Sequence, residues 1–290
     1  MGITVSPLSP AFGVEVHGVN LDRGLDADEA ATLLRLFDEH SLLIFRDQDI
    51  SANDQVDVCR ALRPVVEPHA WVSNVEPGFH PEGELLCHSD FAFTPSPMLG
   101  LSLYAIEIAD GAAPTKFASN ARAARRLPDS LRARVQGLEV VHLIDSVNGR
   151  DNVRTRACDV GGDEAPADLF PRFARPVIWK HPVTGVELLF VLEQQASHFV
   201  GWSCEASDEL LDALFAVVYE PTNVYEHEWR VGDLAVWDNL ALQHGRRANP
   251  NTVRRSLRRV TMNTVTTADL IAGSGFDPVR RQSLRAQTRG

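Results

Sequence analysis

The sequence predicts a mostly β fold with flanking helices, of the double-stranded β-helix or jelly-roll kind that forms a cupin-like barrel. Short apolar runs with the length of a strand recur along the chain, whereas stretches with helical periodicity are few. The run at 177–193 has the pattern of a β-hairpin that turns between Pro182 and Gly185. The 290 residues, 44% of them hydrophobic, can build one sizeable core, so we expect a single domain over 1–290.

Two helices are expected near the start of the chain. The first covers 26–39, where Asp26 is a suitable N-cap and Glu29 has the spacing of a capping box. The second covers 51–62 and begins at Ser51. Further helical segments are expected around 119–137 and at 207–219.

The expected strands are short and spread over the whole chain: 42–45, 98–108, 140–145, the two arms of the hairpin, 233–239, 241–245 and 256–263. Two long irregular stretches interrupt this pattern, near 63–87 and near 146–175. Irregular segments of such length in a compact domain are commonly functional. We therefore expect two lid insertions over an active site.

Composition limits the partners and the compartment. The net charge of −11 argues against a surface for nucleic acids, and no apolar stretch approaches the roughly 20 residues that span a bilayer. The N-terminal sequence lacks the features of a secretory signal, and the four cysteines show no CxxC spacing. These features favour a cytoplasmic protein whose partner is a small molecule.

A metal site is predicted from His88-Ser89-Asp90 and His244. Two imidazoles and one carboxylate are the ligand set of a mononuclear non-haem Fe(II) centre with open positions. In a strand, positions i and i+2 share a face, so a strand that begins at His88 would present His88 and Asp90 on one side. His244 would come from another strand. A competing motif, His80-Pro81-Glu82, lies in a stretch rich in Pro and Gly, where this alternation does not operate.

Two arginines after His244 suggest an anion site. If RRSLRRVT is a strand, Arg255 and Arg259 share one face, while Arg254 and Arg258 share the other. A buried guanidinium needs an anion, and its planar fork matches a carboxylate. The pair on the inner face is therefore a candidate for binding a dicarboxylate.

Taken together, these motifs resemble those of the Fe(II)/2-oxoglutarate-dependent dioxygenases of the taurine dioxygenase and phenoxyacetate dioxygenase family. The segments that carry the resemblance cover most of the chain: GVEVHGVNLDRGLDADEA, SLLIFRDQDIS, HSDFAF, HPVTGVELLFVLE, GDLAVWDNLALQHGRR and RRSLRRVT. The resemblance implies Fe(II) as cofactor and 2-oxoglutarate and O2 as co-substrates. It further implies oxidation of a small substrate, by hydroxylation or oxidative cleavage, and formation of succinate and CO2. Family members are often dimers or tetramers.

The resemblance also assigns residues. His88, Asp90 and His244 fall on the iron ligands. Arg259 falls on the arginine that pairs with the distal carboxylate of 2-oxoglutarate, Thr115 on the threonine that assists it, and Arg255 on the arginine near the keto-acid end. Substrate-contacting positions correspond to His69, Trp71, Phe93 and Gln195.

The sequence indicates the class of the substrate but not its identity. The aromatic residues around the motif suggest an apolar or aromatic substrate with an acidic group. Two alternatives remain open at this stage. One is a metalloenzyme that uses the same three ligands without 2-oxoglutarate, and the other is a non-catalytic binding protein on the same fold.

Overall fold

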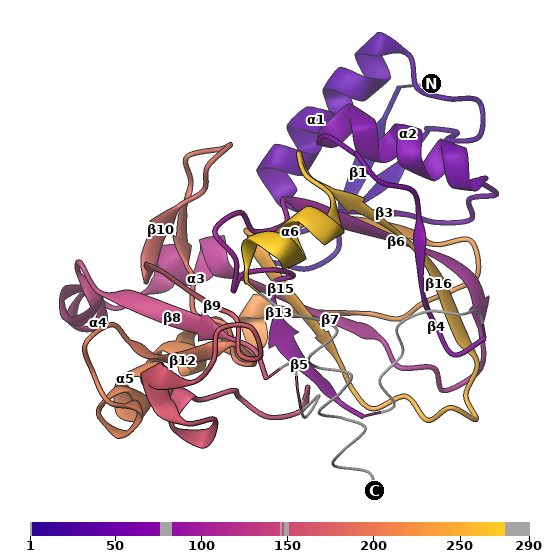
Figure 1. The fold of residues 1–290 in the computed structure, drawn as a ribbon. Helices are drawn as coiled ribbons and strands as arrows, with labels where there is room; N and C mark the ends of the chain where they lie inside the picture. Colours follow the sequence, from indigo (N-terminus) through magenta and orange to yellow (C-terminus); the bar gives the residue numbers. More distant parts are fainter. Residues whose placement is uncertain (1, 76–82, 146, 148–150, 276–290) are drawn as a thin grey trace, which may run out of the picture.

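The computed structural model describes residues 2–75, 83–145, 147 and 151–275. Its strands fall into four sheets, and helices flank them (Figure 1). The predicted mostly β fold with helices is therefore confirmed. Within the described residues, the strands form separate sheets rather than one closed barrel. Every described helix is too short or too polar to cross a membrane.

The largest sheet has seven strands, in the order β1 (Thr4–Pro7), β2 (Val14–His17), β3 (Leu42–Phe45), β14 (Leu234–Asp238), β6 (Gly100–Ile108), β16 (Arg255–Met262) and β4 (Ala70–Ser73). All neighbouring pairs are antiparallel except β2 and β3. Strands from both ends of the chain thus lie side by side, which brings the arginine-rich β16 next to β6 and β4.

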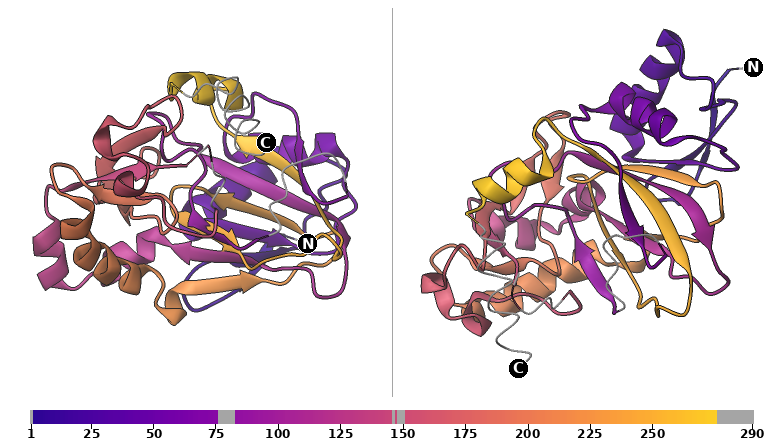
Figure 2. Two further views of the ribbon diagram at one scale, coloured as in Figure 1. Left: turned by 60° about the horizontal axis from the view of Figure 1, so that its bottom comes forward. Right: turned by 45° about the vertical axis from the view of Figure 1, so that its right-hand side comes forward.

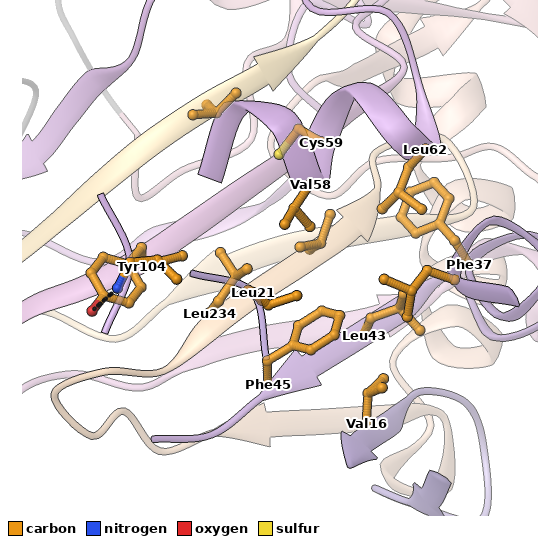
Figure 3. Close-up of a cluster of buried hydrophobic side chains, with 14 of the residues drawn as sticks. Val16, Leu21, Phe37, Leu43, Phe45, Val58, Cys59, Leu62, Tyr104 and Leu234 are labelled. Carbon is orange, nitrogen blue, oxygen red and sulfur yellow. Dashed lines mark hydrogen bonds between the residues drawn. The ribbon is translucent and has the colours of Figure 1, made fainter. Parts of the chain in front are cut away.

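Two helices cover one face of this sheet (Figure 1), α1 (Ala27–His40) and α2 (Ala52–Leu62). Both begin where the sequence predicts, with capping boxes at Asp26 and at Ser51. Their apolar residues pack against alternate residues of the strands, which is the period of two expected for a sheet face. Figure 3 shows this cluster, which includes Val16, Leu21, Phe37, Leu43, Phe45, Val58, Cys59, Leu62, Tyr104 and Leu234.

The opposite face of the seven-stranded sheet meets a second sheet. This sheet has four strands, in the order β13 (Val224–His227), β7 (Thr115–Ser119), β15 (Leu242–Arg246) and β5 (Leu85–His88). Phe117 and Leu242 from this sheet pack in one core cluster with Leu101, Leu103 and Trp237 from the larger sheet. The strands that carry His88 and His244 therefore face the strand that carries the arginines.

The remaining elements form a third layer away from α1 and α2 (Figure 2). They are α3 (Asn120–Arg126), α4 (Asp129–Val135), β8 (Glu139–Leu143), η1 (Ala157–Asp159), η2 (Gly162–Glu164), β9 (Arg172–Pro176), β10 (Ile178–Lys180), β11 (Glu187–Leu189), β12 (Ala196–Phe199), α5 (Cys204–Val218) and η3 (Pro221–Asn223). A last helix, α6 (Thr267–Gly273), follows β16. The predicted hairpin is confirmed, because β10 pairs antiparallel with β11.

The two stretches expected to be irregular contain regular structure. The first, near 63–87, includes β4 and nearly all of β5, and the second, near 146–175, includes η1, η2 and most of β9. The strand β4 was missed because its four residues become ordered by pairing with β16, far away in the sequence. Propensity along the chain does not report such long-range pairing.

Candidate metal centre and co-substrate cavity

Two histidines meet across neighbouring strands. His88 is the last residue of β5, and His244 lies inside β15, where the two are direct partners in the antiparallel register. Partners in such a pair project to the same face of the sheet. Their ring centroids are accordingly 4.3 Å apart. Gly245 allows this close approach, because a Cβ there would lie 2.7 Å from the carbonyl oxygen of Leu85.

Asp90 reaches the histidines from a turn and not from a strand. The strand ends at His88, and Phe91 has a positive φ of 59°. The expectation that His88 opens a strand is therefore wrong, and alternation along a strand does not place Asp90. Asn239 does so instead: its Oδ1 accepts from the backbone N–H of Asp90 at 2.9 Å, and its Nδ2 donates to the carbonyls of Asp90 and Met98 at 3.0 and 2.8 Å.

The three side chains can hold one metal ion. Among the described residues, His88, Asp90 and His244 form the group of potential ligands, with their ligand atoms within 4.8 Å of one another. Oδ1 of Asp90 lies 3.2 Å from Nε2 of His88 and 3.8 Å from Nε2 of His244. Cis ligands at metal–ligand bonds of about 2 Å stand roughly 3 Å apart. Small adjustments of these side chains would therefore complete one face of a coordination sphere.

The protonation states suit a metal as well. Nδ1 of His88 lies 2.9 Å from the carbonyl oxygen of Leu86, so this nitrogen carries the proton and Nε2 keeps its lone pair. Burial lowers the pKa of His244 to about 3, which keeps the ring neutral at physiological pH. Burial would raise the pKa of Asp90, but the positive charge of Arg259 outweighs this effect and holds the pKa well below its usual range.

The two inner arginines of β16 have different surroundings. Arg259 donates from Nη2 to Oδ2 of Asp90 at 2.8 Å, so it lies at the metal end of the site. Arg255 donates from Nη2 to Oγ1 of Thr115 at 3.2 Å and from Nε to the carbonyl of Ala113 at 3.1 Å. Thr115 also accepts from the indole of Trp229 at 3.0 Å. Thr115 thus contacts Arg255, whereas the family resemblance assigned Thr115 to the same carboxylate as Arg259.

Arg255 is a buried cation in need of an anion. It is 1% exposed, no described carboxylate forms an ion pair with it, and its Nη1 has no hydrogen-bond partner in the described structure. Burial, and then the nearby charge of Arg246, lower the pKa of Arg255 to about 9. Such a group is costly to bury unless it binds an acid.

The candidate metal ligands, Thr115, Arg255 and Arg259 line one cavity between the two large sheets. The seven-stranded sheet contributes Val72, Leu101, Leu103, Trp237, Arg255 and Arg259 to its wall. The four-stranded sheet contributes Leu85, His88, Thr115, His244, Gly245 and Arg246, and Asp90 completes the lining. The sequence argument did not name Arg246, although its spacing of two from His244 on a strand could have indicated a shared face.

Comparison with known proteins decides the family. The profile of the "Taurine catabolism dioxygenase TauD, TfdA family" matches residues 4–261. The chain belongs to this family. The match spans the metal ligands, Thr115 and both inner arginines, and so it covers the whole candidate site.

Proteins similar to this chain are named for different substrates. The chain is 28% identical over 288 residues to the "Alpha-ketoglutarate-dependent 2,4-dichlorophenoxyacetate dioxygenase" of Cupriavidus pinatubonensis, covering 90% of this chain and 98% of the relative. It is 25% identical over 276 residues to the "Alpha-ketoglutarate-dependent sulfate ester dioxygenase" of Pseudomonas putida, covering 90% of this chain and 89% of the relative. The crystal structure of AAD-2 in complex with Mn(II) and N-oxalylglycine superposes with a TM-score of 0.77 at 26% identity, covering 92% of this chain and 99% of that one. Since α-ketoglutarate is 2-oxoglutarate, the predicted enzyme class, a 2-oxoglutarate-dependent dioxygenase, is confirmed.

The residues that the family resemblance suggested as substrate contacts lie outside the cavity wall. Trp71 is the partner of Arg258 in the β4–β16 register, and Arg258 points to α2, where Nε donates to Gln55 at 2.8 Å. His69 contacts Trp71 edge to face and lines a surface depression beside α2. The structure thus places both residues on the helix side of the sheet and separates them from the metal ligands.

The other two suggested contacts, Phe93 and Gln195, are also absent from the lining. Phe93 packs on Phe91 with ring centroids 5.6 Å apart, beyond the end of β5. Gln195 is buried, and its Oε1 has no hydrogen-bond partner within the described part of the chain. The competing motif His80-Pro81-Glu82 lies outside the described residues.

Proposed function

We propose that this chain is an Fe(II)- and 2-oxoglutarate-dependent oxygenase that hydroxylates, or oxidatively cleaves, a small organic substrate. The co-substrates 2-oxoglutarate and O2 are converted to succinate and CO2. One observation carries the proposal: a His–Asp–His cluster shares one cavity with a buried arginine that pairs with no carboxylate in the described part of the chain. The first suits a divalent metal with open positions, and the second suits the far end of a dicarboxylate.

In this proposal His88, Asp90 and His244 hold the metal. Bound Fe(II), together with the keto acid and O2, supplies the oxidising chemistry. Burial keeps the imidazole of His244 neutral, the charge of Arg259 keeps Asp90 ionised, and Asn239 fixes the turn at Asp90. Arg259 fixes the second oxygen of Asp90, so that Oδ1 faces the histidines.

The family resemblance assigned Arg259 to the distal carboxylate and Arg255 to the keto-acid end. The contacts of the two arginines support the opposite assignment. Arg255 and Thr115 would bind the distal carboxylate of 2-oxoglutarate, because they touch each other and neither contacts Asp90. Arg259 would lie at the keto-acid end, because it contacts a metal ligand. The solved relative with N-oxalylglycine supports this part of the proposal, since that compound has the 2-oxoglutarate skeleton with NH in place of one CH2.

The cavity wall favours an apolar or aromatic substrate with an acidic group. Val72, Leu101 and Leu103 give one side an apolar surface, and Trp237 adds a ring. Relatives named for a phenoxyacetate and for sulfate esters also agree with an acidic group. His69, Trp71, Phe93 and Gln195 would then act only indirectly.

The proposal includes several features of the whole chain. Residues 1–290 would form one domain of the double-stranded β-helix kind, and segments near 63–87 and 146–175 would cover the cavity. The enzyme would act in the cytoplasm as a homodimer or homotetramer.

Turnover tests this function. Full-length protein with Fe(II), ascorbate, O2 and 2-oxoglutarate is incubated with a panel of aryl and alkyl acids, and succinate is quantified. We expect some acids to stimulate succinate formation and the matching neutral amides to fail, with no succinate from His88→Ala. Substrate oxidation that proceeds without 2-oxoglutarate would favour a metalloenzyme that uses the same ligands differently.

A further inference from the structure

A buried histidine of the β10–β11 hairpin, His181, lies beside the turn that carries Asn239. His181 directly follows β10 and is 2% exposed. Its Nδ1 accepts from the backbone N–H groups of Val183 and Thr184, each at 3.1 Å. Nδ1 therefore carries no proton, and Nε2 is the donor nitrogen of this ring. The hairpin turn thus fixes both the tautomer and the direction of the imidazole.

The donor nitrogen of His181 faces Asp238, the last residue of β14. Nε2 lies 3.1 Å from Oδ1 and 3.0 Å from Oδ2 of this carboxylate. Arg63 is more distant, since its Nη2 lies 4.0 Å from Oδ2 and donates to Asp38. Asp238 is 3% exposed, so loss of the His181 donor would leave part of a buried carboxylate without compensation.

Asp238 in turn shapes the connection between β14 and β15. Its Oδ1 also accepts from the backbone N–H groups of Leu240 at 2.9 Å and Ala241 at 2.8 Å. This is the hydrogen bonding of an Asx turn, in which an aspartate side chain fixes the backbone that follows it. Asn239 lies inside this turn, and its side chain holds the backbone of Asp90. The hydrogen bonds therefore run from the hairpin to a candidate metal ligand.

Apolar contacts hold the same segments together. Leu188 of β11 belongs to one buried cluster with Leu240 and Ala241 of the β14–β15 turn. The cluster also contains Ala92, which comes two residues after Asp90. Hydrophobic packing has no preferred direction, whereas a hydrogen bond does. The contact between the hairpin and the turn is therefore apolar in area, and His181 gives it a defined geometry.

We propose that His181 is a positioning residue for the metal centre: by donating to Asp238 it fixes the turn of Asn239 and, through Asn239, the position of Asp90. This inference rests on the proposed function, since it assumes that the three candidate ligands hold a metal ion. Because His181 acts through two intermediate residues, its loss should displace Asp90 without removing a ligand. The consequence is weaker metal binding in a protein whose ligand set is complete.

Two substitutions separate the two contacts of His181. In His181→Gln the amide nitrogen reaches as far as Nε2 and still donates to Asp238, while the acceptor for the hairpin turn is lost. In His181→Asn the shorter side chain keeps an acceptor for the hairpin turn but does not reach Asp238. Val183→Ala in the same turn is the matched control, because the side chain of Val183 is 52% exposed.

Three measurements are made on the full-length apoprotein and its variants. Anaerobic calorimetric titration gives the Kd of Mn(II). Hydrogen–deuterium exchange of the peptide that contains the backbone amide of Asp90 reports whether its hydrogen bond to Asn239 persists without metal. Urea unfolding records the stability of each variant separately, so that a general loss of stability is distinguished from a displaced turn.

We expect His181→Asn to weaken Mn(II) binding about tenfold and to speed up exchange at Asp90, while His181→Gln and Val183→Ala stay within about twofold of the wild-type affinity. If His181→Asn does not fold, Asp238→Asn decides the matter. That variant keeps an acceptor for the turn but weakens the contact with His181, and the same loss of affinity is expected.

Wild-type affinity in His181→Asn, or equal losses in His181→Asn and His181→Gln, would make His181 a support for the hairpin alone and overturn the inference. A wild type that binds no Mn(II) would instead overturn the proposed function.

Discussion

Arg259 donates a 2.8 Å hydrogen bond to Oδ2 of Asp90, while Oδ1 of the same carboxylate faces the two histidines. The arginine thus leaves one oxygen of Asp90 for a metal. Removing a residue that orients a metal ligand typically weakens metal binding 10- to 100-fold.

Arg259→Met should therefore weaken Mn(II) or Fe(II) binding by about tenfold even without 2-oxoglutarate, and Arg259→Lys should restore part of it. Anaerobic calorimetric titration with the metal alone measures the effect. If metal affinity stays unchanged and only 2-oxoglutarate binds more weakly, Arg259 serves the distal carboxylate, as the family resemblance implies.

Arg255→Met should leave metal binding intact and weaken 2-oxoglutarate by at least tenfold, because the charged group that donates to Thr115 is lost. Thr115→Val removes one neutral hydroxyl and should cost about 1 kcal/mol, or roughly fivefold in Kd. Titration of the iron-loaded protein with 2-oxoglutarate gives both values. Weaker metal binding in either variant would contradict this division of roles.

Gly245→Ala should abolish metal binding without changing any ligand. The new Cβ would lie 2.7 Å from the Leu85 carbonyl and 3.1 Å from the backbone nitrogen of Cys87, so β15 must move away from β5. His244 would then separate from His88. Gly273→Ala is the matched control, because a Cβ there meets nothing within 4 Å. Metal stoichiometry near that of the wild type in Gly245→Ala would refute the argument.

Asn239→Ala should destabilise the fold by about 1–3 kcal/mol and weaken metal binding, because the backbone groups of Asp90 and Met98 lose their partners. Urea unfolding with and without Mn(II) measures both effects, and Asn20→Ala on the surface is the control. Loss of stability with undiminished metal affinity would show that the turn at Asp90 holds without Asn239.

Stability should fall in acid partly through His142, which is fully buried in β8. Burial, and then the charge of Arg175, lower its pKa to about 3. In the unfolded chain the imidazole of His142 therefore binds a proton below about pH 6.5, whereas in the folded protein it binds one only below about pH 3. The free energy of unfolding should decrease as pH falls through this window.

His142→Leu should flatten this decrease by up to about 1.4 kcal/mol per pH unit. Urea unfolding between pH 7 and pH 4 measures the slope, with His17→Leu at the exposed end of β2 as control. A slope unchanged by His142→Leu would mean that His142 is protonated in the folded protein.

Local patterns predicted the chemistry of the site better than its geometry. The three candidate metal ligands follow from their residue types, and the inner pair of arginines follows from period-two spacing. Yet His88 ends its strand, and Asp90 arrives through a turn fixed by Asn239, some 149 positions away. Where a strand ends depends on its partners in the sheet, which neighbouring residues along the chain do not specify.

The different contacts of Arg255 and Arg259 could not be predicted from the sequence, because they depend on how the sheets pack. Thr115 lies on β7 and Arg255 on β16, so their contact depends on the packing of two sheets. Likewise, Trp71 faces the helices because it pairs with Arg258 and not with Arg259. A shift of one residue in that register would have placed it in the cavity.

The most direct test of the central claim is anaerobic. Fe(II) and then 2-oxoglutarate are added to the full-length apoprotein while the visible spectrum is recorded. We expect a charge-transfer band that requires both additions, is absent in His88→Ala and persists in Arg247→Met. Iron binding without a band would contradict chelation of the keto acid at this site, and absence of iron binding would contradict the metal centre itself.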